Sequence, residues 1–198
     1  MRGTHSIDYS IENLMLNGNR WINFPPKESN IDAPLYRFSF LGALSLSVAS
    51  VGLGLAERAC SEILDLLKLK RPLGQRKMLS QQAVVQDKAG QIIAEFETAQ
   101  SVFYNIINDA ESEVVVGACS KIMKAKIRLA SCKTTEMCLN VVRNAYELAG
   151  GHAIWDKNKF EELHRDMHVV SQHAMVSKAN YRTVGAVYLE NDVPEFLL

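Results

Sequence analysis

Three histidines near the end of the chain are the side chains best suited to acid–base or metal chemistry. His164 and His168 are four residues apart, so a helix would place both on one face, where they could bind a single ion. Glu161 and His164 also form a Glu-x-x-His pair, as used in di-iron bundles. A di-iron site needs a second such pair, which the sequence lacks, and Arg165 stands where a zinc protease places its base. We therefore predict no metal site here and expect helix-surface histidines.

His173 is the candidate acid–base residue. An imidazole changes protonation near neutral pH, so it can donate a hydrogen bond to a reactive oxygen or accept a proton from a phenol. No Asp or Glu lies between Asp166 and Glu190, so no carboxylate base accompanies it. A lone histidine is also commonly a structural residue whose hydrogen bonds are satisfied. The spacing alone leaves both interpretations of His173 open.

The elements that must position these residues are helical. Apolar periodicity predicts four helices, at about 36–70, 79–111, 113–149 and 159–190. We expect the last one to bend near Ser171. Gly150 and Gly151 end the third helix, where the backbone needs a positive φ or a close approach. Long helices with short connections predict an all-α, antiparallel four-helix bundle over residues 36–198.

The helix boundaries and the core follow from the same pattern. The segment Arg71–Gly74 (RPLG) separates the first two helices, and Glu113 marks a weak break between the second and the third. The bundle should bury eight apolar side chains, namely Leu41, Leu44, Val48, Phe96, Phe103, Ile122, Leu129 and Val141.

Residues 1–35 differ from the rest and are predicted to form a short extended arm. Ile7, Tyr9 and Ile11 alternate with polar residues, and this period of two suggests a strand. Three prolines, the last of them Pro34, disfavour a helix in the second half of the arm.

Composition narrows the class of protein. The 22 basic and 22 acidic residues balance, so no net field favours nucleic acid or an acidic membrane. The four cysteines form no Cys-x-x-Cys pair, which indicates buried side chains in a reducing compartment.

No signal-peptide pattern is visible, and we expect a cytoplasmic protein. Residues 38–56 carry no charge, but serines and glycines dilute their hydrophobicity, which favours a buried bundle helix over a membrane span.

The segment Ala145–Val176 resembles the C-terminal domain of the acyl-CoA dehydrogenase superfamily, in its flavin-dependent monooxygenase branch. That branch includes 4-hydroxyphenylacetate and dibenzothiophene monooxygenases. In the superfamily the flavin lies against the Gly-Gly turn, so the resemblance implies that Gly150 and Gly151 let the backbone approach FAD or FMN. The fold it implies is the superfamily's C-terminal helical bundle.

The same resemblance assigns a role to His173. The stretches LHRD (163–166) and SQH (171–173) are similar to the segment in which the monooxygenase branch places a histidine near the reactive flavin carbon. Acyl-CoA dehydrogenases commonly place their catalytic glutamate on the loop that follows the Arg-Asp pair. Laid on this chain without gaps, that glutamate falls at Ala174, which cannot remove a proton. The resemblance therefore implies oxygen chemistry and a catalytic His173.

Two further stretches resemble flavin-binding parts of the family. RPLG (71–74), KML (77–79) and VVQ (84–86) are similar to the stretch whose arginine and glutamine contact the flavin diphosphate or adenine, which implies that Arg71 and Gln86 bind a neighbouring subunit's flavin. The alternative is that the basic residues only cap the first helix. RGTHSIDY (2–9) is similar to a stretch that ends the family's β-domain, which implies that Thr4 and Ser6 hydrogen-bond a flavin ring.

The resemblance implies the C-terminal bundle of a two-component monooxygenase. Reduced flavin from a separate reductase would form a flavin hydroperoxide that oxygenates a small aromatic or heteroaromatic substrate. The resemblance covers only the back half of the family's proteins and lacks their N-terminal domain and most of their β-domain. We therefore expect that this chain alone cannot enclose a flavin. Two explanations stay open: the chain is a fragment or a truncated reading frame, or it pairs with a front-half polypeptide, and a flavin reductase is a further candidate partner. Because residues 38–56 are apolar on every face, we also expect a dimer or tetramer.

The alternative function is a non-catalytic oligomerisation or partner-binding module that retains this fold. Such a module would be colourless and would bind neither FMN nor FAD. A third alternative is a metal-binding bundle, which would lose its metal when His164 and His168 are replaced.

Overall fold

The structure is a computed structural model that describes residues 7–18, 20, 31–155 and 158–198. This part of the chain forms five α-helices, α1 (Phe40–Leu69), α2 (Ala83–Val116), α3 (Lys121–Ala149), α4 (Phe160–Ser171) and α5 (Asn180–Tyr188). Short 3₁₀ turns lie between or beside them, namely η1 (Pro34–Arg37), η2 (Leu79–Gln81), η3 (Gly150–His152), η4 (Ala174–Val176) and η5 (Glu195–Leu197). None of the described residues is in a β-strand, which confirms the all-α class.

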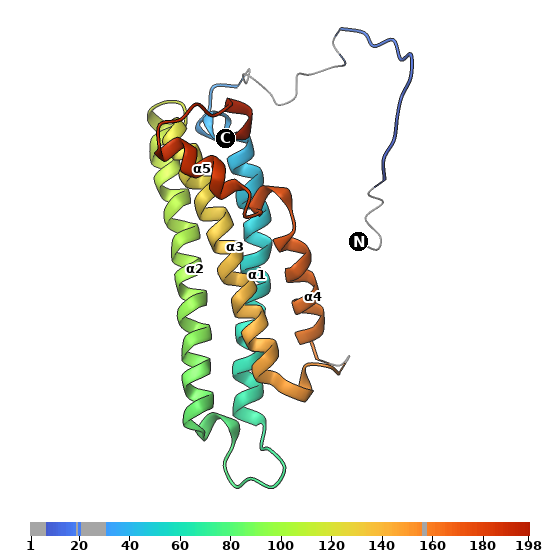
Figure 1. Cartoon of the computed structure of the whole chain (residues 1–198), viewed down its shortest axis with the longest axis vertical. Helices are drawn as coiled ribbons and strands as arrows, with labels where there is room; N and C mark the ends of the chain where they lie inside the picture. Colours follow the sequence, from blue (N-terminus) through green and yellow to red (C-terminus); the bar gives the residue numbers. More distant parts are fainter. Residues whose placement is uncertain (1–6, 19, 21–30, 156–157) are drawn as a thin grey trace.

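Helices α1 to α4 run alternately up and down one axis (Figure 1). The central helix is α3, which packs against α1, α2, α4 and α5, whereas α2 packs mainly against α3. On the side opposite α2, α4 lies against both α1 and α3, and α5 covers α3 near the end where α1 begins. The antiparallel bundle is therefore confirmed, with its fourth position divided between α4 and α5.

The division of the fourth helix occurs where a bend was expected. α4 ends at Ser171, whose hydroxyl donates to the carbonyl oxygen of His168 at 2.8 Å. His173 then adopts an extended backbone, with φ −68° and ψ 135°, and α5 begins only at Asn180. The chain consequently turns between the two helices, and His173 lies on that turn.

The predicted break at Glu113 is wrong. Glutamate is a good helix former, and α2 continues to Val116 before Gly117 ends it in an extended conformation. The Glu113 carboxylate accepts a hydrogen bond from the amide of Ser120 at 2.8 Å, which closes the turn between the helices. The Ser120 hydroxyl accepts from the amide of Met123 and caps the start of α3.

The first helix begins four residues later than predicted. Its start is set by Ser39, whose hydroxyl accepts a hydrogen bond from the amide of Gly42 at 3.0 Å. The preceding residues form the separate turn η1.

Small residues allow α1 to approach its neighbours closely. Ala49 and Ala56 are fully buried, and a Cβ on Gly52 would lie 3.1 Å from the terminal methyl of Met167 in α4. By length and composition alone α1 could cross a membrane, but the core helix of a bundle satisfies the same criterion. In the described part of the chain α1 packs against α3 and α4.

The core differs in part from the predicted one. Phe103 and Val141 are buried, whereas Leu44 and Ile122 are 39% and 41% exposed, so the prediction is wrong for these two. Leu44 lies off the buried face of α1, which follows Leu46, Ala49 and Leu53. The other predicted core residues are half-buried, namely Leu41, Val48, Phe96 and Leu129.

The predicted strand near the N-terminus is wrong. Ile7, Tyr9 and Ile11 are 75%, 85% and 66% exposed, and residues 7–12 pair with no strand in the described part of the chain. An alternating pattern yields a strand only where a neighbouring strand accepts its hydrogen bonds and one face is covered.

The four cysteines are buried and free, as their spacing predicted. Burial, followed by a smaller effect of Glu57, raises the pKa of the Cys60 thiol to about 11. Burial, the Cys60 thiol and Glu95 raise the pKa of Cys138 to about 12. Both thiols are therefore protonated at neutral pH and act as small apolar side chains.

Candidate functional site

One end of the bundle joins the loop after α1 to the turn after α3. The ammonium group of Lys70 donates to the carbonyl oxygen of Ala149 at 3.4 Å, which links the residue after α1 to the last residue of α3. The amide of Leu79 donates to the carbonyl oxygen of Lys70 at 3.0 Å and closes the loop (Figure 1). This end of the molecule therefore gathers four of the predicted flavin-binding residues, Arg71, Gln86, Gly150 and Gly151.

The two glycines of this turn have different backbone requirements. Gly150 ends α3 with φ 57° and ψ −138°, a conformation that strains any residue with a Cβ, so the predicted positive φ is found there. Gly151 has no positive φ, and a Cβ on it would meet no atom within 4 Å. Within this chain, then, the backbone requires glycine at Gly150 and does not require it at Gly151.

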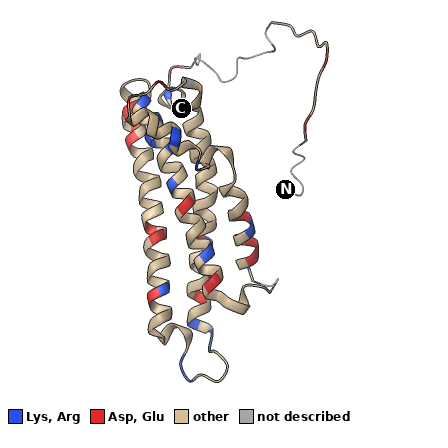
Figure 2. Cartoon of the chain, in the orientation of Figure 1, with Lys and Arg blue, Asp and Glu red and all other residues tan. Residues whose placement is uncertain are grey.

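The loop between α1 and α2 presents positive charge at the same end. Arg71, Arg76 and Lys77 are exposed there (Figure 2). Gln86 is also exposed, and its side-chain amide donates to the carbonyl oxygen of Ser80 at 2.9 Å, which stabilises the entry into α2. Guanidinium groups beside a helix start suit an anionic group such as a diphosphate. Flavin binding by Arg71 and Gln86 stays a prediction.

His173 occupies a different place in the bundle. Its Nδ1 accepts a hydrogen bond from the amide of Met175 at 3.2 Å, so the ring caps the η4 turn. A neutral imidazole that accepts at Nδ1 carries its proton on Nε2. The ring is exposed, and its Nε2–H is the group available to a ligand. The neighbouring Ala174 offers no acid or base.

The His173 turn and the Gly150 turn are far apart. The guanidinium of Arg128 in α3 donates to the carbonyl oxygen of Met175 and so places the His173 turn beside this part of α3. Arg128 precedes Gly150 by about six helical turns, which corresponds to about 33 Å along α3. The bundle consequently separates the predicted catalytic residue from the four residues that gather at the other end.

The remaining predicted contacts, Thr4 and Ser6, lie outside the described residues.

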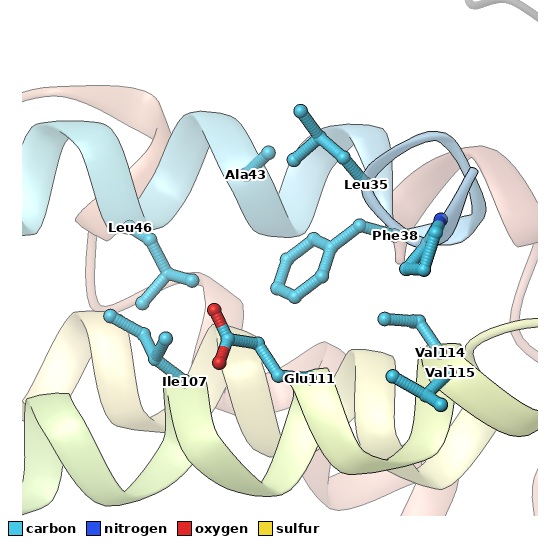
Figure 3. A pocket seen from close by; sticks show the side chains of 9 residues that line it. Leu35, Phe38, Ala43, Leu46, Ile107, Glu111, Val114 and Val115 are labelled. Carbon is cyan, nitrogen blue, oxygen red and sulfur yellow. The ribbon is translucent and has the colours of Figure 1, made fainter.

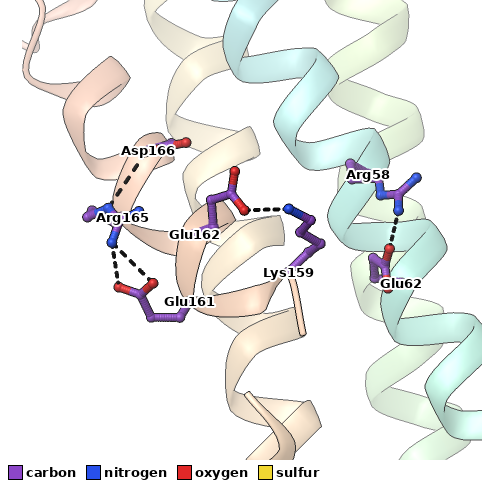
Figure 4. A network of polar contacts seen from close by, with 7 residues as sticks. All are labelled: Arg58, Glu62, Lys159, Glu161, Glu162, Arg165 and Asp166. Atoms are coloured by element: carbon purple, nitrogen blue, oxygen red, sulfur yellow. Dashed lines mark hydrogen bonds and ion pairs between the residues drawn. The ribbon is translucent and has the colours of Figure 1, made fainter. Parts of the chain in front are cut away.

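The Arg-Asp motif on α4 forms only local contacts. Arg165 pairs with Glu161 at 3.0 Å and lies 3.9 Å from Asp166, and Lys159 pairs with Glu162 at 2.7 Å (Figure 4). All of these side chains are at least half exposed, and solvent screening leaves such pairs with little effect on stability. Among the described residues, the ion pairs of Arg165 and Asp166 stay on α4 and do not reach the His173 turn, so the motif acts as a solvated helix face.

The ring of His164 lies between those of Tyr146 and His168, in tilted contact with each. The ring centroid of His164 lies 4.7 Å from that of Tyr146 and 4.6 Å from that of His168. Burial, followed by the charge of His168, lowers the pKa of His164, against an opposing effect of Glu161 and Glu147. Among the described residues no group of three or more His, Cys, Asp or Glu side chains is arranged to hold a metal ion.

A surface pocket that the sequence did not predict lies between the start of α1 and the end of α2. Its volume is about 410 Å³, and its walls are apolar except for the carboxylate of Glu111. The ring of Phe38 and the side chain of Leu46 point into the space above Ile107 (Figure 3). None of the predicted site residues lines this pocket.

Sequence comparison decides the family. The family model described as acyl-CoA dehydrogenase, C-terminal domain, matches residues 46–178, which include α2, α3, α4 and the His173 turn. The chain belongs to this family. The expected resemblance to the acyl-CoA dehydrogenase C-terminal domain is therefore confirmed.

Two relatives of the chain are monooxygenases by name. The chain is 27% identical over 188 residues to an indole-3-acetate monooxygenase of Acinetobacter baumannii, covering 94% of this chain and 48% of the relative. It is 25% identical over 197 residues to an indole-3-acetate monooxygenase of Pseudomonas putida, covering 98% of this chain and 50% of the relative. The chain thus spans about half the length of these relatives.

The fold of this family member also matches a solved flavoprotein. XiaF from a Streptomyces species, solved in complex with FADH2 and glycerol, superposes with a TM-score of 0.74 at 16% identity. The match covers 82% of this chain and 42% of XiaF. At this identity the likeness establishes the fold.

Two side chains of this site were not predicted from the sequence. Arg128 and Asn180 contact the His173 turn, yet they lie 52 residues apart in the chain. Arg128 falls on the buried face of α3, between Ala125 and Cys132. A charged residue inside a helical apolar stripe is the sequence signal that could have drawn attention to it.

Proposed function

We propose that this chain is the C-terminal helical part of a two-component, flavin-dependent monooxygenase. Its substrate would be a small heteroaromatic compound of the indole-3-acetate kind. The observation that carries the proposal is the match of 94% and 98% of the chain to two indole-3-acetate monooxygenases. The histidine at 173 and the alanine at 174 support it, because an α-proton abstraction would need a carboxylate where this chain has none.

The charge and the backbone geometry at the Gly150 end of the bundle support binding of a flavin that is shared with the remaining domains of such a protein. Arg71 would pair with the diphosphate of a neighbouring subunit's flavin, and Gln86 would contact its adenine end, since both lie far from His173 along α3. Open space beside Gly151 and the positive φ of Gly150 would allow the backbone to approach it. When bound, FAD or FMN supplies the activation of molecular oxygen, and the protein supplies position and the exclusion of water.

His173 would act on a proton at the reacting centre. Its Nδ1 is engaged by the amide of Met175, so Nε2 is the atom that donates a hydrogen bond or a proton. Because the ring is exposed in this chain, the residues that would enclose it must come from the other half of the protein or from another subunit. A reductase that delivers the reduced flavin is the corresponding partner.

The test is His173→Ala in the full-length protein, or in an assembly that supplies the remaining domains together with a flavin reductase. Loss of one acid–base group should lower product formation about 100-fold or more while flavin affinity changes little. Gln172→Ala, at the exposed neighbouring position, is the matched control and should retain activity. Equal oxygenation by the His173 variant would refute the proposed role.

A further inference from the structure

The turn that carries His173 is hydrogen-bonded to a buried arginine of α3. Arg128 is 4% exposed, and its Nη1 donates to the carbonyl oxygen of Met175 at 3.1 Å. Its Nη2 donates to Oδ1 of Asn180 at the start of α5. Because the donors of a guanidinium form a rigid planar fork, these two contacts fix Met175 and Asn180 relative to α3.

Asn180 extends this connection to the rest of the turn. Its Nδ2 donates to the carbonyl oxygens of Ala174 at 3.0 Å and Ser177 at 2.9 Å. Two side chains therefore bind three carbonyl groups of the turn, those of Ala174, Met175 and Ser177. The amide of Met175 is the donor to Nδ1 of His173, so a displacement of Met175 would displace the group that orients the imidazole.

Further polar contacts join one face of α3 to the segment that follows His173. One turn after Arg128, the Cys132 thiol lies 3.5 Å from the carbonyl oxygen of Ser177. One further turn on, the Glu136 carboxylate accepts from the Tyr181 hydroxyl at 3.3 Å. Residues at this spacing share a helix face, so α3 presents a continuous polar stripe to the segment that follows His173.

If packing were its only role, burial of the charged Arg128 side chain would be energetically unfavourable. Its described hydrogen-bond partners include no carboxylate, and burial lowers the pKa of the guanidinium because it disfavours the charged form. Apolar side chains of similar volume are often at least as stabilising as buried charges. The guanidinium differs from such a side chain in its directed hydrogen bonds to the turn.

We propose that Arg128 and Asn180 are positioning residues that hold the His173 imidazole in one orientation, with Nδ1 as acceptor and Nε2–H free. The catalytic relevance of this orientation rests on the proposed function of His173. The orientation itself is a property of the chain without flavin.

The experiment is nitrogen NMR of the histidine rings together with amide hydrogen exchange, in the 198-residue chain and three variants. Arg128→Met keeps volume and removes the donors. Asn180→Asp keeps the oxygen that contacts Arg128 and removes the two donors to the turn. Lys126→Met, at an exposed position of the same helix, is the matched control. The spectrum of His173→Ala assigns the His173 signals.

We expect the Nε2–H form of His173 in the wild type and in the Lys126 variant. In the Arg128 and Asn180 variants we expect a mixture of both ring tautomers, and exchange of the Met175 amide that is about 10-fold faster. Should Arg128→Met fail to fold, Asn180→Asp decides alone. Folded variants whose His173 signals and Met175 exchange match the wild type would overturn the proposal.

These measurements contain no flavin and no substrate. A negative result would therefore remove the positioning role while leaving the His173→Ala activity test of the proposed function unaffected. Conversely, a tautomer mixture and faster Met175 exchange in the Arg128 and Asn180 variants could be found together with a fully active His173→Ala protein. That result would support the positioning role and refute the proposed function of His173.

Discussion

At the residue scale, Gly150 and Gly151 are adjacent yet differ in what their backbone requires. The φ of 57° at Gly150 disfavours any side chain, whereas Gly151 has open space around its missing Cβ. A glycine that the fold itself does not need is a candidate for contact with something outside the chain.

We predict that Gly150→Ala lowers the free energy of unfolding by about 1–3 kcal/mol, the range for residues held in sparsely populated backbone regions. Gly151→Ala should change it by less than about 0.5 kcal/mol. Urea denaturation of the two variants measures the difference. In the flavin-bound protein Gly151→Ala should instead weaken cofactor binding, and equal stability losses at both positions would contradict this account.

His164 gives a pH-dependent prediction at the same scale. Burial and the charge of His168 lower its pKa below the ordinary value of 6.5. Between the lowered pKa and 6.5, the unfolded chain binds the proton more readily than the folded chain, so stability falls as the pH drops below about 6.5. His164→Phe retains a ring against Tyr146 and removes this titration.

We therefore expect the melting temperature to fall less between pH 7.5 and pH 5.5 in His164→Phe than in the wild type. The difference should be small, because the ring is only partly buried. Thermal denaturation followed by circular dichroism measures it, and parallel pH profiles for the two proteins would show that His164 does not contribute.

At the scale of elements, α3 is the helix on which the others are packed. Its buried polar side chains are mostly hydrogen-bonded, as at Thr135, whose hydroxyl donates to the carbonyl oxygen of Ser131 at 2.9 Å. Ser131 in turn lies within hydrogen-bond distance of Ser45 in α1. Thr134 is the exception among the described residues, since its buried hydroxyl has no partner.

This contrast predicts opposite effects of the same substitution at neighbouring positions. Thr134→Val should raise the free energy of unfolding by about 1 kcal/mol, because it removes an unsatisfied buried hydroxyl. Thr135→Val should lower it by about 1 kcal/mol, because it removes a made hydrogen bond. Chemical denaturation of both variants tests the pair, and destabilisation by Thr134→Val would show that its hydroxyl does have a partner.

At the scale of the whole molecule, α1 exposes apolar side chains in the described part of the chain. Leu44 and Val51 are 39% and 54% exposed, and their spacing places them on one side of the helix. Apolar surface of this kind marks contacts with other chains or domains. The expectation of a dimer or tetramer stays a prediction.

We expect light scattering at tens of micromolar to give a dimer or tetramer, and Val51→Lys to shift it toward the monomer. Leu73→Lys is the control, since Leu73 is a fully exposed apolar residue on the α1–α2 loop. A wild-type chain that is monomeric at this concentration would contradict the prediction.

The sequence by itself determined the helical class, the family and the place of Gly150. Apolar residues at a spacing of 3–4 impose helices locally, and a glycine is needed wherever φ is positive. The family could be recognised from the LHRD and SQH stretches because the residues of each stretch are contiguous in the chain. The break at Glu113 and the strand at residues 7–12 failed because caps and neighbouring strands, not periodicity, decide where an element begins and whether it forms.

Only the tertiary structure decided which predicted residues lie together. It gathers Arg71, Gln86 and the glycine turn at one end of the bundle and leaves His173 about 33 Å away along α3. It also brings Arg128 to Asn180, across 52 residues of sequence. Periodicity reports which face of a helix is buried but not which neighbour covers it, because that choice depends on the packing of the whole bundle.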